Sequence, residues 1–154
     1  MASKLLINTD FRPLSLNRDL DFLVEIAATS FPFPRSRKQL TNLFVDSQTY
    51  TIVAEPPRYR PVAFISWQVD EDSADVVELA VHFSRRRKGI GRELIAAAAD
   101  RQKYLGTIPL SAIVPESNIV ACRFYAACGW HATGVLRGYF ELPAEDGYRF
   151  EAPR

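Results

Sequence analysis

Two blocks of residues have the types and spacing that suit chemistry on a phosphate-bearing ligand. In the first, Arg86-x-x-Gly89-x-Gly91 follows a mostly apolar run over residues 76–83 and opens an alanine-rich segment. A strand that leads through a glycine turn into a helix directs backbone N–H groups and the helix N-terminus toward one point, which suits a pyrophosphate. The spacing matches neither the G-x-x-x-x-G-K-S/T phosphate loop nor the G-x-G-x-x-G dinucleotide fingerprint. The block therefore indicates a phosphate loop of another kind.

The second block lies further along the chain and reads Asn118-Ile-Val-Ala-Cys-Arg-Phe-Tyr125-Ala-Ala-Cys-Gly129-Trp130. Asn118 and Tyr125 are seven residues apart, so they share one face of a helix. Together the two blocks resemble the GNAT superfamily of N-acetyltransferases. Its acyl-CoA pyrophosphate loop has the pattern R-x-x-G-x-G, and its later block reads N-x-x-A-x-x-x-Y-x-x-x-G-F. Trp130 stands where that later block usually has phenylalanine.

The resemblance implies that acetyl-CoA is the co-substrate and that backbone N–H groups of the loop hold its pyrophosphate. Asn118 is expected to bind it from the second helix, a role compatible with that of a plain N-cap. The other candidate cofactor-binding residues are Leu79, Ala80 and Val81, whose strand backbone pairs with the pantetheine arm in the family, and the loop residues Arg86, Arg87, Lys88, Gly89, Ile90 and Gly91.

Tyr125 is the predicted general acid, because the family places this tyrosine beside the cofactor sulfur. A phenol with a pKa of about 10 can donate to a thiolate whose conjugate acid has a pKa of about 8.5. The alternative is a core aromatic residue on an amphipathic helix.

Two carboxylates are candidates for the general base, Glu78 and Asp75, and their spacing on a strand points them to opposite faces. Glu78 is favoured, since a carboxylate within an apolar strand has a free-energy cost that asks for a functional reason. Asp75 has a second interpretation, in which it ends the preceding turn.

Three aromatic residues are candidates for holding the acceptor amine. The stretch over residues 31–36, FPFPRS, resembles F-P-x-P-W-S of the bacterial ribosomal-protein alanine N-acetyltransferase group. Residues 136–140, LRGYF, with an expected acidic turn at residues 144–147, resemble that group's R-R-N-Y-Y and its D-G turn. Phe31, Phe33 and Tyr139 are therefore predicted to bind substrate, and an edge-strand aromatic is the alternative for Tyr139.

Three positions depart from that group's pattern. Arg35 stands in place of tryptophan, Gly138 in place of asparagine, and Ile113 in place of the catalytic glutamate. Loss of that glutamate is easier to tolerate when the acceptor is an α-amine, whose pKa of about 7.7–8.0 leaves it partly neutral, than when it is a lysine with a pKa near 10.4. A small-molecule amine with a lowered pKa meets the same condition.

The sequence thus predicts an acetyl-CoA-dependent N-acetyltransferase that moves an acetyl group to a primary amine by direct attack in a ternary complex. A protein N-terminal amine is one candidate acceptor. Two alternatives stay open. One is a small-molecule amine acetyltransferase acting on an antibiotic, a polyamine or an amino acid. The other is a non-catalytic acyl-CoA-binding module, which would bind the cofactor without turnover.

Bulk composition sets outer limits on these functions. The 154 residues predict one domain, residues 1–154, with room for a sizeable core. A net charge of +1 argues against a nucleic-acid partner. Cys122 and Cys128 are not expected to form a disulfide or a metal site, and no signal peptide or membrane span is expected. We therefore expect a cytoplasmic enzyme without a metal or a membrane partner, as a monomer or a homodimer.

The apolar spacing predicts an α/β fold with a mixed, mostly antiparallel sheet of about seven strands and about four helices. A strand–helix–strand crossover over residues 76–114 makes its two strands parallel; that this pair splays apart is implied only by the resemblance. The expected strands are residues 5–12, 49–55, 62–69, 76–83, 108–114, 132–140 and 148–151, and the expected helices are residues 16–29, 36–44, 89–104 and 118–128.

Overall fold

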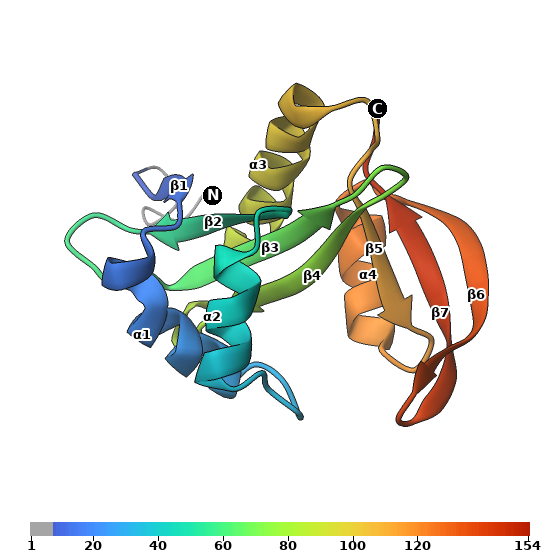
Figure 1. Cartoon of the computed structure of the whole chain (residues 1–154), viewed down its shortest axis with the longest axis horizontal. Helices are drawn as coiled ribbons and strands as arrows, with labels where there is room; N and C mark the ends of the chain where they lie inside the picture. Colours follow the sequence, from blue (N-terminus) through green and yellow to red (C-terminus); the bar gives the residue numbers. More distant parts are fainter. Residues whose placement is uncertain (1–7) are drawn as a thin grey trace. The chain divides into compact units, whose positions relative to one another are not determined.

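The computed structural model describes residues 8–154 and contains four α-helices and seven strands, with one short 3₁₀ turn (Figure 1). The strands form one hydrogen-bonded sheet in the order β1-β2-β3-β4-β5-β7-β6, in which the pair β4–β5 is parallel. This confirms the predicted fold class. The strands are β1 (Asp10–Pro13), β2 (Thr49–Glu55), β3 (Ala63–Val69), β4 (Ala74–Val81), β5 (Ser111–Pro115), β6 (His131–Glu141) and β7 (Ala144–Glu151), and the helices are α1 (Leu16–Ala28), α2 (Arg37–Val45), α3 (Ile90–Leu105) and α4 (Ile119–Ala127).

The described chain divides into two compact units. We call residues 8–68 and 77–98 the N-terminal unit, and residues 69–76 and 99–154 the C-terminal unit. Strand β4 and helix α3 each contribute residues to both.

The N-terminal unit is built on a meander of strands with two helices packed against it. β1 pairs antiparallel with β2, and β2 pairs antiparallel with β3. The apolar face of α1 buries Leu23 and Ile26 against Leu40 of α2 and Phe64 of β3. α2 begins at a capping box, in which Ser36 and Gln39 satisfy each other's backbone N–H groups. This core holds both ends of the loop between α1 and α2.

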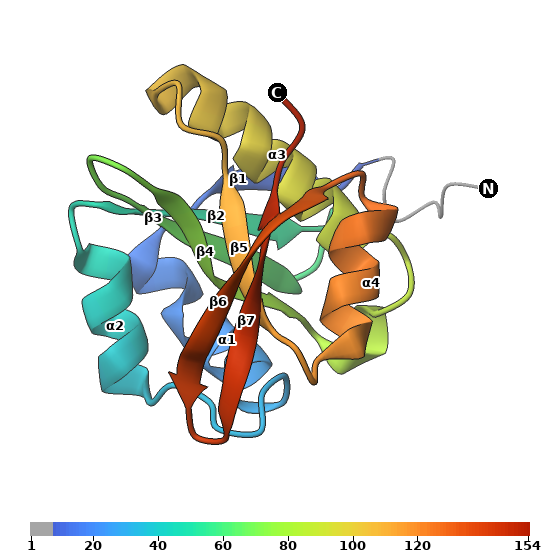
Figure 2. The ribbon, with the colours of Figure 1, turned by 90° about the vertical axis from the view of Figure 1, so that its right-hand side faces the viewer.

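The C-terminal unit is built on a long twisted hairpin of β6 and β7, drawn in red in Figure 2. β7 also pairs antiparallel with β5, and β5 pairs in parallel with the start of β4 at Ser111 and Asp75. α4 buries Tyr125, whose ring lies within 6 Å of Trp130 and Phe150, at centroid distances of 5.0 and 5.9 Å.

Strands β4 and β5 are displaced from their predicted positions. β4 runs from Ala74 to Val81 rather than over residues 76–83, because His82 accepts a hydrogen bond from Ser84 N–H and starts the 3₁₀ turn. β5 begins at Ser111 rather than at residue 108. Pro109 has no N–H to give to a ladder, and the Ile108 carbonyl accepts a hydrogen bond from Gln102 instead.

The prediction of an acidic turn at residues 144–147 is wrong. These residues form the start of β7, and the hairpin turns at Leu142 and Pro143. The two carboxylates of this stretch accept hydrogen bonds that attach β7 to neighbouring segments. Asp146 accepts one from Gly138 N–H at 2.8 Å, and Glu145 accepts one from Ser117 N–H at 3.0 Å. The first strand begins at Asp10 in the structure; the expected residues 5–7 lie outside the described range.

Candidate active site

The predicted phosphate loop, residues 86–91, leads directly into the N-terminus of α3. Arg87 and Gly89 both have positive φ, 61° and 83°, and Ile90 anchors the start of the helix with a side chain that is 1% exposed. A left-handed backbone at a non-glycine residue is strained and is found at functional loops. The first intrahelical bond of this turn comes from Glu93 N–H, so the preceding N–H groups have no carbonyl partner in the helix. A basic, exposed loop with free donors at a helix N-terminus fits a pyrophosphate.

The Arg86 side chain binds groups of the protein itself. Its Nε donates to the Val81 carbonyl at 3.0 Å, and an Nη donates to the Thr29 carbonyl at 3.3 Å and to Ser30 Oγ at 3.2 Å. The guanidinium thus fastens the phosphate loop to the end of β4 and to the C-terminus of α1. The predicted cofactor role of Arg86 is therefore one for its backbone N–H, because the side chain is already bound within the protein. The last carbonyl groups of a helix lack donors within the helix. This general need is the signal in the sequence for a donor such as Arg86 near the end of α1.

Glu78 is the buried carboxylate of β4. Its side chain is 6% exposed, and Oε1 accepts a hydrogen bond from Arg35 Nε at 2.6 Å. The other oxygen, Oε2, is buried and has no hydrogen-bond partner within residues 8–154. Burial raises the pKa of this carboxyl, and the hydrogen bond and charge of Arg35 oppose that rise. A buried carboxyl with one free oxygen and a raised pKa is a general-base candidate.

Asp75 lies on the same strand in a contrasting environment. Its Oδ1 accepts two hydrogen bonds, one from Ser111 Oγ and one from an Arg149 Nη at 3.1 Å, and this Nη also donates to Ser111 Oγ at 2.9 Å. The three residues come from β4, β5 and β7 and tie these strands together. Neither Ser111 nor Arg149 lies in a motif, so no local pattern predicts this cluster.

Tyr125 and Asn118 both belong to α4. Asn118 Oδ1 accepts from Ala121 N–H at 3.1 Å, which makes it the N-cap. Burial and the neighbouring Cys128 raise the pKa of the Tyr125 phenol, so it stays protonated at neutral pH. Within residues 8–154 its hydroxyl makes no hydrogen bond, although its ring is packed among aromatic neighbours. The predicted roles of both residues toward the cofactor stay predictions.

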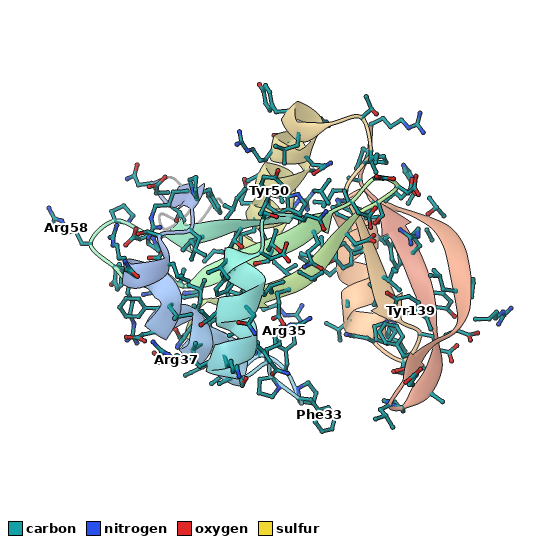
Figure 3. The ribbon with its side chains drawn as sticks, in the orientation of Figure 1. Phe33, Arg35, Arg37, Tyr50, Arg58 and Tyr139 are labelled. Atoms are coloured by element: carbon teal, nitrogen blue, oxygen red, sulfur yellow. The ribbon has the colours of Figure 1, made fainter. Side chains whose placement is uncertain are left out.

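The three candidate acceptor residues have different surroundings. Phe31 packs against the core of the N-terminal unit. Phe33 is 89% exposed and lies at the tip of the loop between α1 and α2, and Arg35 follows it in the same loop, just before the N-cap of α2 (Figure 3). Tyr139 is half exposed on β6 and packs edge-to-face on Phe140. Of the two loop aromatics, therefore, Phe33 is the one available for contact, while Phe31 supports the loop.

The position where the resembled group has its catalytic glutamate is closed by packing. Ile113 lies on β5 beside Gly147 of β7, and a Cβ built on Gly147 would come within 2.7 Å of Ile113 Cγ2. The side chain of residue 113 therefore fills the space above a glycine and supplies no titratable group.

The family of the chain follows from these features and from a match to a family model. The acetyltransferase (GNAT) family model matches residues 20–130, which include β4, the phosphate loop and α4. The chain belongs to the GNAT family and is an acetyl-CoA-dependent N-acetyltransferase.

Relatives and solved structures agree with this family. A curated relative from Salmonella typhimurium, named ribosomal protein bS18-alanine N-acetyltransferase, is 28% identical over 130 residues, which are 84% of this chain and 85% of the relative. The crystal structure of ribosomal-protein-S18-alanine N-acetyltransferase from Escherichia coli has a TM-score of 0.79 at 24% identity, covering 94% of this chain and 93% of that one. Arabidopsis thaliana NAA60 in complex with acetyl-CoA has a TM-score of 0.77 at 18% identity, covering 94% and 98%.

Within residues 8–154, every helix is too short or too polar to cross a membrane. In the same range there is no group of three or more His, Cys, Asp and Glu side chains arranged to hold a metal ion. Cys122 and Cys128 are both free thiols.

Proposed function

We propose that the acceptor is the α-amine of a protein N-terminus and that Glu78 is the base that deprotonates it. The observation that carries the proposal is the Glu78 carboxyl, with one oxygen held by Arg35 and the other buried and free. An α-ammonium, with a pKa of about 7.7–8.0, needs only a modest base at neutral pH. The curated relative's acceptor, a ribosomal-protein alanine, is of this class and supports the same choice.

In this mechanism acetyl-CoA supplies the acetyl group as a thioester. Glu78 Oε2 accepts the proton of the α-ammonium, directly or through one water, and leaves a neutral nitrogen that can attack a carbonyl carbon in a ternary complex. A carboxyl with a raised pKa is a better proton acceptor than an ordinary one, while the Arg35 contact keeps the charged form accessible.

Tyr125 acts at the leaving group. Because burial raises the pKa of its phenol, complete proton transfer to a thiolate is uphill, and the hydroxyl serves as a hydrogen-bond donor that stabilises the departing sulfur. The loop over residues 86–91 and the backbone of Leu79, Ala80 and Val81 bind the cofactor, with Asn118 contributing from α4. Phe33 and Tyr139 contact the acceptor peptide.

Asp75 is the weaker base candidate. Its carboxylate already accepts hydrogen bonds from Ser111 and Arg149, so taking a proton would weaken both contacts. We assign it a structural role instead.

We further propose that both units work as one catalytic domain over residues 1–154, in the cytoplasm. The two free thiols suit a reducing compartment. The enzyme acts as a monomer or a homodimer, without nucleic acid.

The test is acetylation of matched acceptors, followed by mass spectrometry. A peptide with a free N-terminal alanine should be acetylated once, at its α-amine. The same peptide with a blocked N-terminus and one internal lysine should be inert, and so should spermidine. Turnover on spermidine but not on the free peptide would replace the proposed acceptor with a small amine. Cofactor binding without turnover on any of the three would support a binding module.

A further inference from the structure

Glu78 receives a single hydrogen bond from the described chain, and that bond comes from a residue 43 positions away in sequence. Arg35 Nε donates to Oε1 at 2.6 Å, whereas Oε2 is buried without a partner. One guanidinium therefore determines which oxygen of the carboxylate is occupied and which remains free. Charge-assisted hydrogen bonds of this length are among the stronger ones in proteins.

The backbone that carries Arg35 is restrained on both sides. Pro34 comes before it with a φ fixed by its ring. Ser36 comes after it as the N-cap of α2, where its N–H donates to Gln39 Oε1 at 2.8 Å and its Oγ accepts from Gln39 N–H at 3.2 Å. Little backbone freedom is lost when the Arg35 side chain meets Glu78, so the contact is pre-organised.

We propose that Arg35 is a positioning residue for acetyl transfer, which holds Oε1 of Glu78 so that Oε2 alone meets the acceptor ammonium. This inference rests on the proposed role of Glu78 as the base. Arg35 does not itself touch the reacting atoms in this account; it fixes the rotamer and the charge of the residue that does. The resembled enzymes have tryptophan at this position, so the device belongs to this chain.

The contact between Arg35 and Glu78 affects the pKa of Glu78, and this effect can be measured. A purely structural contact would leave that pKa unchanged. Within residues 8–154, Arg35 is the charged group that acts on the Glu78 carboxyl, and it lowers a pKa that burial raises. The Arg35 side chain is 42% exposed and keeps contact with water, while that of Glu78 is 6% exposed. Removing Arg35 leaves burial unopposed, and the pKa of Glu78 should rise further.

The experiment compares the pH dependence of kcat/KM for wild type, Arg35→Met and Arg35→Lys, with an N-terminal alanine peptide and saturating acetyl-CoA. Arg35→Met should move the acidic limb of the profile to higher pH, with a loss at pH 7 of about tenfold, well below the 10²–10⁴-fold contribution of a general base. The loss should shrink as the pH rises, and the KM for acetyl-CoA should stay unchanged. Arg35→Lys keeps the charge and should keep the limb nearer to its wild-type position.

Arg37→Met is the matched control. Arg37 lies two residues away and pairs with Asp21 at 2.6 Å on the surface of the N-terminal unit. Its removal should leave the limb in place. An Arg35→Met profile that drops equally at all pH values would overturn the inference, since that is what loosening of the loop produces.

A carbon-13 NMR titration of the Glu78 carboxyl separates this inference from the proposed function. The signal, assigned by its loss in Glu78→Gln, should titrate at higher pH in Arg35→Met than in wild type; a titration that stays in place overturns the inference even if Glu78 is the base. If Glu78→Gln acetylates the peptide at the wild-type rate, the proposed base is wrong, whatever Arg35 does. If Arg35→Met does not fold, Arg35→Gln takes its place in the same titration, because it also removes the charge and the Glu78 signal should again titrate at higher pH than in wild type.

Discussion

Glu78 and Asp75 lie three residues apart on one strand, yet their surroundings differ in almost every respect. Glu78 is buried in the N-terminal unit, with one partner and one oxygen left without a hydrogen bond. Asp75 belongs to the C-terminal unit, is about a quarter exposed, and is bound by both Ser111 and Arg149. Burial raises the pKa of the first carboxyl, whereas the second is part of a closed hydrogen-bonded cluster that links three strands.

The contrast shows how surroundings separate a reactive carboxylate from a structural one. A buried acceptor without a partner costs free energy, roughly 1–3 kcal/mol, that a purely structural residue would not be expected to retain. A partly exposed carboxylate whose Oδ1 accepts two cross-strand hydrogen bonds stabilises the sheet instead.

The first prediction compares the two carboxylates in the reaction. Glu78→Gln should lower kcat/KM for an N-terminal alanine peptide by about 10²–10⁴-fold, because the amide cannot accept the proton. Asp75→Asn should change it by no more than about threefold. Both variants should bind acetyl-CoA as wild type does in a thermal-shift titration. A larger rate loss in Asp75→Asn than in Glu78→Gln would reverse the assignment of the base.

The second prediction tests the packing between β5 and β7, which carry the two partners of Asp75. Gly147→Ala places a Cβ 2.7 Å from Ile113 Cγ2, between the two strands that carry Ser111 and Arg149. Such overpacking should lower the free energy of unfolding by about 1–3 kcal/mol in urea titrations. Gly134→Ala on β6 is the matched control: its Cβ would meet nothing within 4 Å, and the change should stay within about 0.5 kcal/mol. Equal losses in both variants would mean that β5 and β7 shift enough to relieve the contact with Ile113.

The fold was largely predictable because its signals are local. Ser36 and Gln39 have the spacing of a capping box and mark the start of α2, and the spacing of Asn118 and Tyr125 predicted α4. Prediction was poorer where a side chain far along the chain decides the outcome. Glu145 and Asp146 look like a turn in sequence, but they lie on β7 because Ser117 and Gly138 donate hydrogen bonds to them.

In the candidate site, too, residues with a local sequence signal could be predicted and their distant partners could not. Glu78 could be proposed from its isolated charge in an apolar strand, and the phosphate loop from its glycines. The partners of these residues had no sequence signal: Arg35 meets Glu78 across 43 positions, and Arg149 meets Asp75 across 74. Such pairings depend on tertiary register, which no local pattern specifies. Phe31 and Phe33 show the same limit, since one packs on the core and the other is exposed although they are two residues apart.

The third prediction concerns the stability that Asp75 supplies. Asp75→Asn should lower the free energy of unfolding by about 1 kcal/mol, because the partly exposed pair with Arg149 loses its charge while the fold remains intact. Adding Arg149→Met in a double-mutant cycle should reveal a coupling of similar size. Asp100→Asn removes the same charge from an exposed residue of this unit, whose contact with Lys103 is 3.9 Å long, and should cost less than about 0.5 kcal/mol. No coupling between residues 75 and 149 would contradict a structural role for the pair.

The last prediction has the opposite sign and concerns Glu78. Its pKa in the folded state is raised by burial, so its contribution to stability is fully present below the pKa of the unfolded chain, about 4.3, and is lost as the pH rises through the folded value. At pH 7.5 the ionised carboxylate therefore works against folding, and Glu78→Gln should unfold at a slightly higher urea concentration than wild type. The advantage should decline as the pH is lowered to 4.5, where the wild-type carboxyl takes up its proton. Glu25→Gln, an exposed site in the same unit, should show no such trend. If Glu78→Gln instead loses stability at pH 7.5, as Asp75→Asn is expected to, then the ion pair with Arg35 outweighs the burial of the charge, and Glu78 is held for structure as Asp75 is.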